Sequence, residues 1–555
     1  MRYKKNIKFT VLAVIICIAT MELKAETIHQ WDVYTISFKS KNIYDNPYIN
    51  MPTTSGDDLL KVTFQGVDGD ALNKKISVVG FWNGGSEWCV RFSPPFTGKW
   101  KYVSVSTDKS LNGIKGSLNV IPWTEEEKAE NSTRRGLVKV RDTGENSGRF
   151  FEYSDGQPFL WIGDTWWRWT KPRIEFDTFK QLVDDRAEKG FTVGQLFFPF
   201  NTLQARVYTV LDLEHVRRID KMIQYANSKG ITVWIHGWWG CENMKTRFGS
   251  EDMRRWIRYL IHRYGAYNVI WVVTGEYNLY NNGGFSLDYW NDLGSLIKNE
   301  DPYNRLVSIH NTPPFWTGGA EAPQWAVGEV FQKESWLDFN QSQVGHGKYA
   351  NEMIPVVVTE EYARQPIKPI VVTEPWYEFI EGSASGKDIR FGAWSAILSG
   401  AAGHTYGGGH VWIGHVPESP ETGGEWPLDT SFDCTTYNYE GAVSMKHLIT
   451  FFKKIKWWEM EPHPELIEYP QSFCLAKPNE EYVIYLRYGG EVKIKMDNSK
   501  ILNNYTYQWF NPSSGEYGDI EKVQVDDVLT LKAPESYPTT LDLSDWVLYI
   551  QGIAE

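Results

Sequence analysis

Cysteine is scarce in this sequence, and its few residues are scattered. Five cysteines occur among 555 residues, with no CxxC pair and no Cys/His cluster, which argues against a structural zinc site. Four of them lie beyond residue 25: Cys89, Cys241, Cys434 and Cys474. A disulfide between Cys241 and Cys434 is compatible with an oxidising compartment, and the sequence leaves that pairing open.

Positively charged blocks and phosphate-binding loops are also missing. The chain has 57 basic and 69 acidic residues, a net charge of −12, which argues against nucleic acid or an anionic membrane as a partner. No GxxxxGK[ST] motif occurs, and no GxGxxG follows the first strand of the barrel predicted below, so we expect no cofactor. The glycine-rich "YGGGH" at 406–410 opens no clear helix and is interpreted as a tight loop.

No segment has the roughly 18 uninterrupted apolar residues that a transmembrane helix needs. Residues 1–25 have instead the layout of a secretory signal peptide, because a basic stretch at 2–8 precedes the apolar residues 9–19 and Ala25 is the expected cleavage point. The residue before Cys17 is isoleucine, where a lipoprotein would need a small residue. We therefore expect a periplasmic or secreted protein, released after the signal is removed.

Three patterns divide the rest of the chain. Residues 26–122 form short alternating runs punctuated by Gly, Pro and Asn, which predicts an antiparallel β-sandwich. Residues 123–136 are polar and are expected to be a linker. From 137 to 452, apolar strands alternate with amphipathic helices in about eight units, which predicts a (β/α)8 TIM barrel. Residues 453–555 return to short strands, so we expect a second, C-terminal β-sandwich. A doubly wound sheet is the alternative for the central part, and the missing nucleotide loop disfavours it.

In a (β/α)8 barrel the active site lies at the C-terminal ends of the strands. The predicted strand bodies are apolar, whereas polar groups and tryptophans gather at their ends. "NVIWVVTGEYN" (268–278) ends the fourth strand with Glu276, and "KPIVVTEPWYE" (368–378) ends the seventh with Glu374. Other strand-end side chains are predicted to bind substrate: Asp164, Trp166, His236, Trp238, Asn278, His310, His346, Trp376, His404 and Tyr406. Trp167, Asn201, Trp239 and Asn311 also lie at strand ends.

Two carboxylates across a tryptophan-lined cleft are the groups that glycoside hydrolysis requires. One protonates the leaving oxygen, and the other attacks the anomeric carbon or activates water. The fourth and seventh strands stand nearly opposite one another, so Glu276 and Glu374 can flank one sugar. Glu360, in the similar stretch "VVVTEEY" (356–362), is a rival to Glu374, but its surroundings are compatible with a helix. Aromatic residues make up 15% of the chain, with 26 Trp, which suits stacking on flat, weakly polar ligands and also fills large cores.

Two other classes of function share parts of this pattern. A non-catalytic glycan-binding protein would have the tryptophans but would not need both glutamates. A metal-dependent sugar isomerase could use the strand-end histidines, but no Glu, Asp or His stands at ligand spacing, so we expect no metal. Product release from a glycan panel separates a hydrolase from a binding protein, and sensitivity to a chelator would favour the isomerase.

The strand-end motifs resemble those of a known family. "LWIGDTWW", "WVVTGEYN", "DFNQSQVGH", "KPIVVTEPWYE" and "GAAGHTYGGGHVW" are similar, in chain order, to motifs of the apiosidase-like glycoside hydrolases. "VRFSPPFTGKWKY" resembles the N-terminal sandwich that often precedes that barrel, and "QWFNPSSGEY" with "DWVLYI" resembles a C-terminal domain named for collagen binding. The resemblance covers nearly all of the mature chain. It implies a retaining glycoside hydrolase with Glu276 as acid/base and Glu374, in preference to Glu360, as nucleophile.

Glu276 departs from the family pattern. Characterised apiosidases carry an aspartate at the acid/base position, and a glutamate is one methylene longer, which leaves open whether apiose is the sugar. We expect the substrate to be a complex, plant-type polysaccharide or its oligosaccharides. To donate a proton near neutral pH, Glu276 needs a pKa above the ordinary value of about 4.3. Burial and the charge of Glu374 are expected to raise it.

The first prediction concerns the two glutamates. Glu276→Gln and Glu374→Gln should each lower turnover by orders of magnitude, because each removes a carboxylate that the reaction needs. The melting temperature of either variant, measured beside that of the wild type, should change by only a few degrees. Near-normal turnover in one variant would remove that residue from the mechanism.

Overall fold

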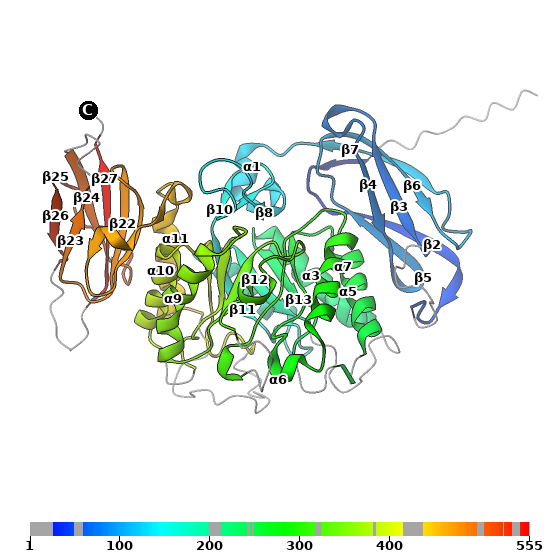
Figure 1. Ribbon diagram of the computed structural model, residues 1–555. Coiled ribbons are helices and arrows are strands. Elements are labelled where there is room, and N and C mark those ends of the chain that lie inside the picture. The colour runs from blue at the N-terminus through cyan, green and yellow to red at the C-terminus, as the bar shows by residue number, and fades with distance from the viewer. Residues whose placement is uncertain are drawn as a thin grey trace, which may run out of the picture.

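The computed structural model has three parts in chain order, with a barrel between two β-domains (Figure 1). It describes residues 26–48, 59–198, 212–240, 245–246, 249–316, 324–380, 384–414, 437–496, 504–525, 527–534 and 544–553. The expected barrel flanked by two sandwiches is confirmed. The signal peptide, Asn201, Cys241 and Cys434 lie outside the described residues, so the cleavage and the disulfide stay predictions.

The N-terminal domain is a sandwich of two sheets. One sheet has five strands, in the order β1 (Glu26–His29), β7 (Lys115–Ile121), β6 (Gly98–Val105), β3 (Lys61–Gly66) and β4 (Lys75–Val79). The other pairs β2 (Tyr34–Tyr44) with β5 (Phe81–Phe92), and η1 (Gly69–Ala71) follows β3. All pairs are antiparallel except β1 with β7. Alternate residues of β3 are buried, and its Phe64 stacks on Phe92 with ring centroids 3.8 Å apart.

The expected linker is a helical segment. α1 (Glu125–Glu130) starts with a capping box, in which the Thr124 side chain accepts from the Glu127 N–H and the Glu127 carboxylate accepts from the Thr124 N–H. The short η2 (Ser132–Arg135) follows.

A small sheet that the sequence pattern did not predict lies next to η2. It contains β8 (Val138–Val140), β9 (Phe151–Tyr153) and β10 (Pro158–Phe159), in the order β10, β9, β8. Figure 1 shows this sheet and α1 at the end of the barrel opposite α6 (Leu279–Asn282), which follows the fourth barrel strand.

Eight parallel strands form the barrel. In sheet order they are β15 (Val307–Ser308), β14 (Val269–Val272), β13 (Thr232–His236), β12 (Val193–Phe197), β11 (Trp161–Trp166), β18 (Gly403–Tyr406), β17 (Ile370–Glu374) and β16 (Asn340–Gln343). The ring closes between β15 and β16 through separate hydrogen bonds rather than a ladder. The Asp338 N–H donates to the Val307 carbonyl at 3.0 Å, the Val307 N–H donates to the Asp338 carboxylate at 2.8 Å, and the Ser308 hydroxyl donates to the Phe339 carbonyl at 2.9 Å.

Helices cover the outside of the barrel. The long ones are α2 (Phe176–Lys189), α3 (Leu213–Ser228), α5 (Ser250–Tyr264), α7 (Leu287–Glu300), α9 (Lys348–Ala363), α10 (Gly386–Leu398) and α11 (Glu440–Phe452). Short turns are α6, η3 (Pro314–Trp316) and α8 (Gly328–Phe331). Glu360 lies on α9 and is exposed, so this rival carboxylate belongs to the helical layer and not to a strand end. No helix in the described segments is both long enough and apolar enough to cross a bilayer.

Aromatic side chains fill the half of the barrel at the amino-terminal ends of the strands. Trp161 of β11 lies 5.1 Å from Trp234 of β13 and 5.4 Å from Phe339, measured between ring centroids. Phe151 of β9 packs on Trp161 and Phe339 from outside the barrel, so the small sheet plugs this end of it. Nearer the carboxyl ends of the strands, Gln195 of β12 donates to the Thr373 carbonyl of β17 at 2.8 Å, across the interior. The barrel is a packed core whose open end lies at the carboxyl ends of the strands.

The C-terminal domain is an antiparallel sandwich. Its six-stranded sheet has the order β19 (Glu461–Pro462), β21 (Phe473–Lys477), β22 (Glu481–Leu486), β27 (Trp546–Gly552), β24 (Asn504–Phe510) and β25 (Glu521–Gln524). Its three-stranded sheet contains β20 (Ile467–Glu468), β23 (Glu491–Lys495) and β26 (Val528–Lys532). The turns η4 (Trp457–Glu459) and η5 (Pro464–Leu466) precede them.

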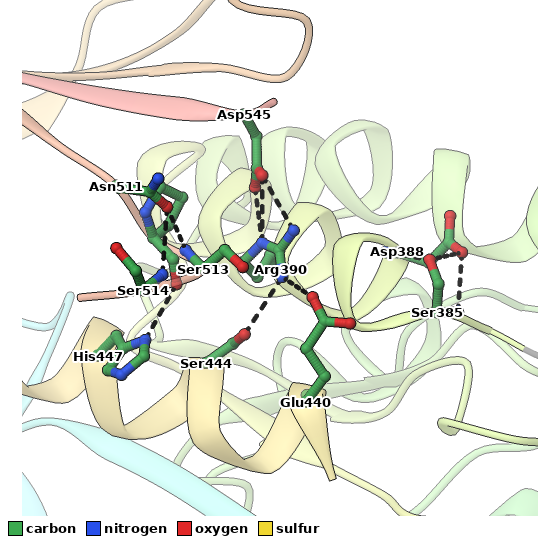
Figure 2. Close-up of polar contacts among 12 residues, drawn as sticks. Ser385, Asp388, Arg390, Glu440, Ser444, His447, Asn511, Ser513, Ser514 and Asp545 are labelled. Carbon is green, nitrogen blue, oxygen red and sulfur yellow. Dashed lines mark hydrogen bonds and ion pairs between the residues drawn. The ribbon is translucent and has the colours of Figure 1, made fainter. Parts of the chain in front are cut away.

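Buried arginines join both sandwiches to the barrel. Arg390 of α10 donates to both carboxylate oxygens of Asp545 in the C-terminal domain, at 2.9 to 3.2 Å, and to Glu440 at the start of α11 (Figure 2). On the other side, Arg91 of β5 pairs with Asp220 of α3 at 2.8 Å.

Candidate active site

The two candidate catalytic glutamates lie at the carboxyl ends of β14 and β17. Glu374 is the last residue of β17 and is 5% exposed, and the half-buried Glu276 follows β14 by four residues. Two strands separate β14 from β17 on one side of the ring and four on the other, so the glutamates face each other across the open end. The charge of Glu374 raises the pKa of Glu276, so the two carboxylates interact electrostatically.

Glu276 has an unusual backbone conformation. Its φ is 42°, in the left-handed region that a non-glycine residue seldom adopts and that is enriched at functional sites. Its N–H points at His310 Nδ1, 3.4 Å away. The preceding Gly275 is required because a Cβ there would lie within 2.2 to 2.7 Å of the Trp239 ring. This close approach lets Trp239 lie beside the glutamate.

Two neutral donors hold the Glu276 side chain. Trp239 Nε1 donates to Oε2 at 2.7 Å, and Gln343 Nε2, at the end of β16, donates to Oε1 at 3.0 Å. Each carboxylate oxygen therefore has one fixed partner. Such bonds favour the charged form.

The pKa of Glu276 is raised to about 7. Burial is the main cause and the charge of Glu374 the second, while His310, Gln343 and Trp239 act in the opposite direction. The expected elevation of this pKa is confirmed. Near neutral pH the group exists in both protonation states, as a residue that gives up and takes back a proton must.

Two imidazoles flank the Glu374 carboxylate. His310 Nε2 lies 3.2 Å from Oε2, and His346 Nε2 lies 3.8 Å from Oε1. His310 Nδ1 accepts the Glu276 N–H, so the proton of a neutral His310 is on Nε2, toward Glu374. His346 Nδ1 is 3.1 Å from the Pro375 carbonyl, which can only accept, so its proton is on Nδ1. His310 thus contacts both catalytic candidates.

Aromatic rings surround the carboxylate pair. The Trp167 ring is 4.8 Å from both the His236 and the Trp239 rings, and its Nε1 donates to the Tyr377 hydroxyl at 2.8 Å. Burial and the neighbouring Glu374 carboxylate raise the pKa of Tyr377 well above its ordinary value. Burial and His310 lower the pKa of His236, so its imidazole is neutral. Neither His236 nitrogen has a hydrogen-bond partner within the described part of the chain.

Four residues predicted to bind substrate face the helices instead. Asp164 is fully buried and accepts from Arg186 of α2 at 2.6 Å and from Trp166 Nε1 at 2.9 Å. Trp166 itself packs edge-on against α2. Tyr406 donates to the buried Glu378 at 2.7 Å, also away from the carboxylate pair.

His404, the fourth of these residues, lies on the same side of β18 as Tyr406. Its ring lies close to Gly392 of α10, so close that a Cβ added to this glycine would be in van der Waals contact with it. Burial lowers the pKa of His404 to about 3. The strand residues that face the interior are their neighbours, such as Thr405, whose hydroxyl accepts from Gln195 at 3.0 Å.

Three further predicted residues support loops at this end. Trp238 belongs to the core cluster that includes α5, with its Nε1 3.5 Å from the Met253 carbonyl. Trp376 donates to the Ile380 carbonyl at 2.8 Å. Asn278 accepts from the Thr312 N–H at 2.7 Å and joins the loops after β14 and β15. The structure therefore brings together Glu276, Glu374, His236, His310 and His346 from the predicted set.

The sequence reasoning did not select Trp167, Trp239, Gln343 and Tyr377. Trp167, Trp239 and Tyr377 each stand one position after a selected tryptophan. Gln343 lies inside the quoted motif "DFNQSQVGH", from which only the histidine was selected. Alternate residues along β11 lead from Trp161, which the structure places in the interior, to Thr165 and then Trp167, but the sequence of this fully buried strand does not mark Trp161 as interior.

The described residues contain no group of three His, Cys, Asp or Glu side chains placed to hold a metal ion. The four strand-end histidines do not converge, because His404 faces α10 while His310 and His346 approach Glu374.

Known protein families match all three parts of the chain. Residues 145–459, more than half of the sequence, match the apiosidase-like catalytic domain. Residues 27–107 match a domain of unknown function, and residues 468–551 match a domain of a collagenase provisionally named collagen-binding. No functionally curated protein matches the chain.

Solved structures share the fold. A family 5 glycoside hydrolase from Bacteroides vulgatus superposes with a TM-score of 0.63 at 19% identity, over 76% of this chain and 95% of its own. A second Bacteroides vulgatus protein, provisionally named a glycoside hydrolase, gives a TM-score of 0.68 at 18% identity, over 95% of this chain and 100% of its own. At these identities the likeness establishes the fold alone.

The donors to Glu276 yield a prediction about pH dependence. Gln343→Leu removes a bond that lowers the pKa of Glu276, so this pKa should rise, by up to about one unit. The alkaline limb of kcat/KM should move to higher pH by the same amount, because the acid form persists longer. The same change at Gln65, in the N-terminal sandwich, should leave the profile unaltered. An unmoved limb in Gln343→Leu would mean that Glu276 is not the acid.

The raised pKa of Glu276 also predicts a pH-dependent stability effect. An acid whose folded pKa is about 7 stabilises the fold fully below its unfolded pKa of roughly 4.3, and this contribution is lost as the pH rises through 7. Glu276→Gln, which cannot ionise, should therefore melt a few degrees higher relative to the wild type at pH 8.5 than at pH 5. Calorimetry at both pH values measures this, with Glu360→Gln on the exposed side of α9 as the control. Equal differences at both pH values would contradict the raised pKa.

Proposed function

This chain belongs to the apiosidase-like family and is a glycoside hydrolase, and we propose that it acts with retention of anomeric configuration. Glu374 is the nucleophile and Glu276 the acid/base. One observation carries the proposal. Two carboxylates face each other across the open end of the barrel, and one of them has a pKa near neutrality that the charge of the other helps to raise.

The environment of Glu374 suits a nucleophile. His310 Nε2 lies 3.2 Å from Oε2, where its electrostatic attraction stabilises a carboxylate charge although the two atoms are not aligned as a hydrogen bond. In the first step a Glu374 oxygen bonds to the anomeric carbon, while the leaving oxygen takes the proton of Glu276 as its bond to that carbon breaks. The products are a glycosyl ester of Glu374, ionised Glu276 and a leaving group that ends in a hydroxyl.

The second step reverses the role of Glu276. Esterified Glu374 has no charge, so the electrostatic part of the elevated Glu276 pKa disappears and the carboxylate becomes a weaker base, ionised at neutral pH. It takes a proton from water as the water oxygen bonds to the anomeric carbon, and the Glu374 carboxylate leaves. Two displacements at the same carbon restore its original configuration.

We assign substrate binding to the residues that face this pair. Among them are His236, which is fully buried and whose two nitrogens have no hydrogen-bond partner in the described part of the chain, and His346, which lies beside the nucleophile. Trp167 and Tyr377 form an adjacent wall. Asp164, Trp166, Trp238, Trp376, His404 and Tyr406 support the barrel and its loops through the contacts given above.

The substrate class and the location are part of the same proposal. The acidic chain and its many aromatic residues suit a weakly polar polysaccharide more than a polyanion. A signal peptide over residues 1–25 would deliver the enzyme to the periplasm or the medium, where plant-type polysaccharides and their oligosaccharides are met.

The test is product analysis on a panel of oligosaccharides capped by different sugars. Proton NMR of the first product formed should show the anomer of the substrate, and a 2-fluoro glycoside with a good leaving group should label Glu374, as detected by mass spectrometry of peptides. The inverted anomer would overturn retention and the nucleophile role. Binding of the panel without any product would instead favour a glycan-binding protein.

A further inference from the structure

Three aromatic side chains form a row near the carboxyl end of β16. The Trp325 ring lies 6.0 Å from the Phe315 ring and 6.3 Å from the Tyr349 ring. Phe315 is 50% exposed, Tyr349 is 67% exposed and Trp325 is half-buried. We call these three residues the aromatic row. Neighbouring exposed aromatic rings on a folded surface are typical of a binding site.

Trp325 is fixed to two residues whose chain neighbours are the acid/base and one of its hydrogen-bond donors. Its carbonyl accepts from the Ser342 hydroxyl at 2.7 Å, and Ser342 precedes Gln343, which donates to Glu276. The preceding Gln324 donates to the Tyr277 hydroxyl, and Tyr277 directly follows Glu276. Two short connections therefore lead from Trp325 to the acid/base.

Phe315 reaches the same place from the loop after β15. Its ring lies so close to Gly345 that a Cβ there would be 2.8 Å from it. Gly345 has a φ of 87°, a conformation that favours glycine. This glycine lies between Gln343, which bonds to Glu276, and His346, which contacts Glu374. The row thus begins at the loop between Gln343 and His346, two residues that contact the carboxylate pair, and continues to Tyr349 at the start of α9.

We propose that the aromatic row binds the leaving-group portion of a glycan chain whose scissile bond lies between Glu276 and Glu374. The proposal rests on the proposed function and extends it to the substrate class. The substrate is a chain with at least two sugars beyond the cleaved bond, and a lone sugar with a small leaving group uses only part of the site.

The placement of Glu276 decides which portion is bound. The acid/base protonates the oxygen of the leaving group, so the sugar that follows this oxygen lies next to the acid/base. Trp325 is attached to Ser342 and, through Gln324, to Tyr277, and the chain neighbours of these two residues are Gln343, which donates to Glu276, and Glu276 itself. Flat apolar rings match the apolar faces of sugars, and binding energy from this remote portion can be used in the transition state.

The test compares Tyr349→Ala and Trp325→Ala with wild type on two probes. One probe is a pool of tri- to hexasaccharides made by partial acid hydrolysis of neutral plant cell-wall polysaccharides, and the other is a set of 4-nitrophenyl glycosides of the sugars in that pool. Each variant should lose about tenfold in kcat/KM on the oligosaccharides through a higher KM, and stay within about twofold on the nitrophenyl glycosides. Tyr488→Ala, at a 40% exposed tyrosine of the C-terminal domain, is the matched control and should change neither.

A second measurement separates this proposal from the proposed function. Binding of the same pool to Glu374→Gln should weaken about tenfold when Tyr349→Ala is added. If wild type cleaves the pool but Tyr349→Ala matches it on both probes, or loses equally on both, the aromatic row does not bind the leaving group and the hydrolase assignment stands. If nothing is cleaved, the binding comparison still tests the role of the aromatic row, because unchanged binding would contradict the proposal that the row binds the glycan. Tyr349 is mostly exposed, so its variant gives a result even where Trp325→Ala is destabilised.

Discussion

Desolvation of two facing carboxylates is the constraint on which the rest of the site depends. A carboxylate removed from water is destabilised unless other groups replace the lost hydrogen bonds, and a second negative charge nearby adds to the effect. The barrel meets this with Trp239 and Gln343 on the oxygens of Glu276 and with two imidazoles beside those of Glu374. For Glu276 these bonds do not offset burial and the nearby charge, and its pKa stays elevated. In the proposed mechanism, this elevated pKa is what suits Glu276 to donate a proton and take it back.

Backbone strain at Glu276 follows from the same constraint. The chain leaves β14 through Gly275, turns into a left-handed conformation and directs the Glu276 N–H to His310. A left-handed residue with a side chain is destabilised by about 1 kcal/mol or more relative to ordinary backbone. The bridge between Trp239 and Gly275 and the contact with His310 hold it in place. Stability of the surrounding barrel thus supports a local geometry that the isolated loop would not keep.

The architecture and the positions of the two glutamates could be predicted from the sequence, because a charge that ends an apolar strand is conspicuous. Which face of a strand each side chain points to could not be predicted. β11 and β18 are buried on both faces, so hydrophobicity does not alternate along them, and a choice between Asp164 and Thr165, or His404 and Thr405, has no periodic signal. Gln343 was hidden for another reason. A register shift between Ser342 and Gln343 sets it beside Glu374, and such a bulge leaves no mark in composition.

The packing of the C-terminal domain also depends on a two-sided sheet. Along β22, Tyr482 and Ile484 face the interior of the sandwich, whereas Val483 and Tyr485 belong to the barrel core cluster. Tyr485 stacks on Trp394 of α10 and donates to Asp545, the partner of Arg390 (Figure 2). A sheet that is apolar on both faces cannot expose one of them without a large loss of burial. The domain is therefore a fixed part of the catalytic unit rather than a tethered module.

Two donors restrict the carboxyl group that we propose as the acid/base. A glutamate has one more rotatable bond than an aspartate, and so has more conformations to lose before its proton points at a leaving oxygen. Trp239 and Gln343 fix both oxygens and remove that freedom before substrate arrives. The same bonds oppose the effect of burial, which alone would hold the proton too tightly for transfer at neutral pH. Orientation and acidity are thus set by one pair of hydrogen bonds, and neither can be changed without the other.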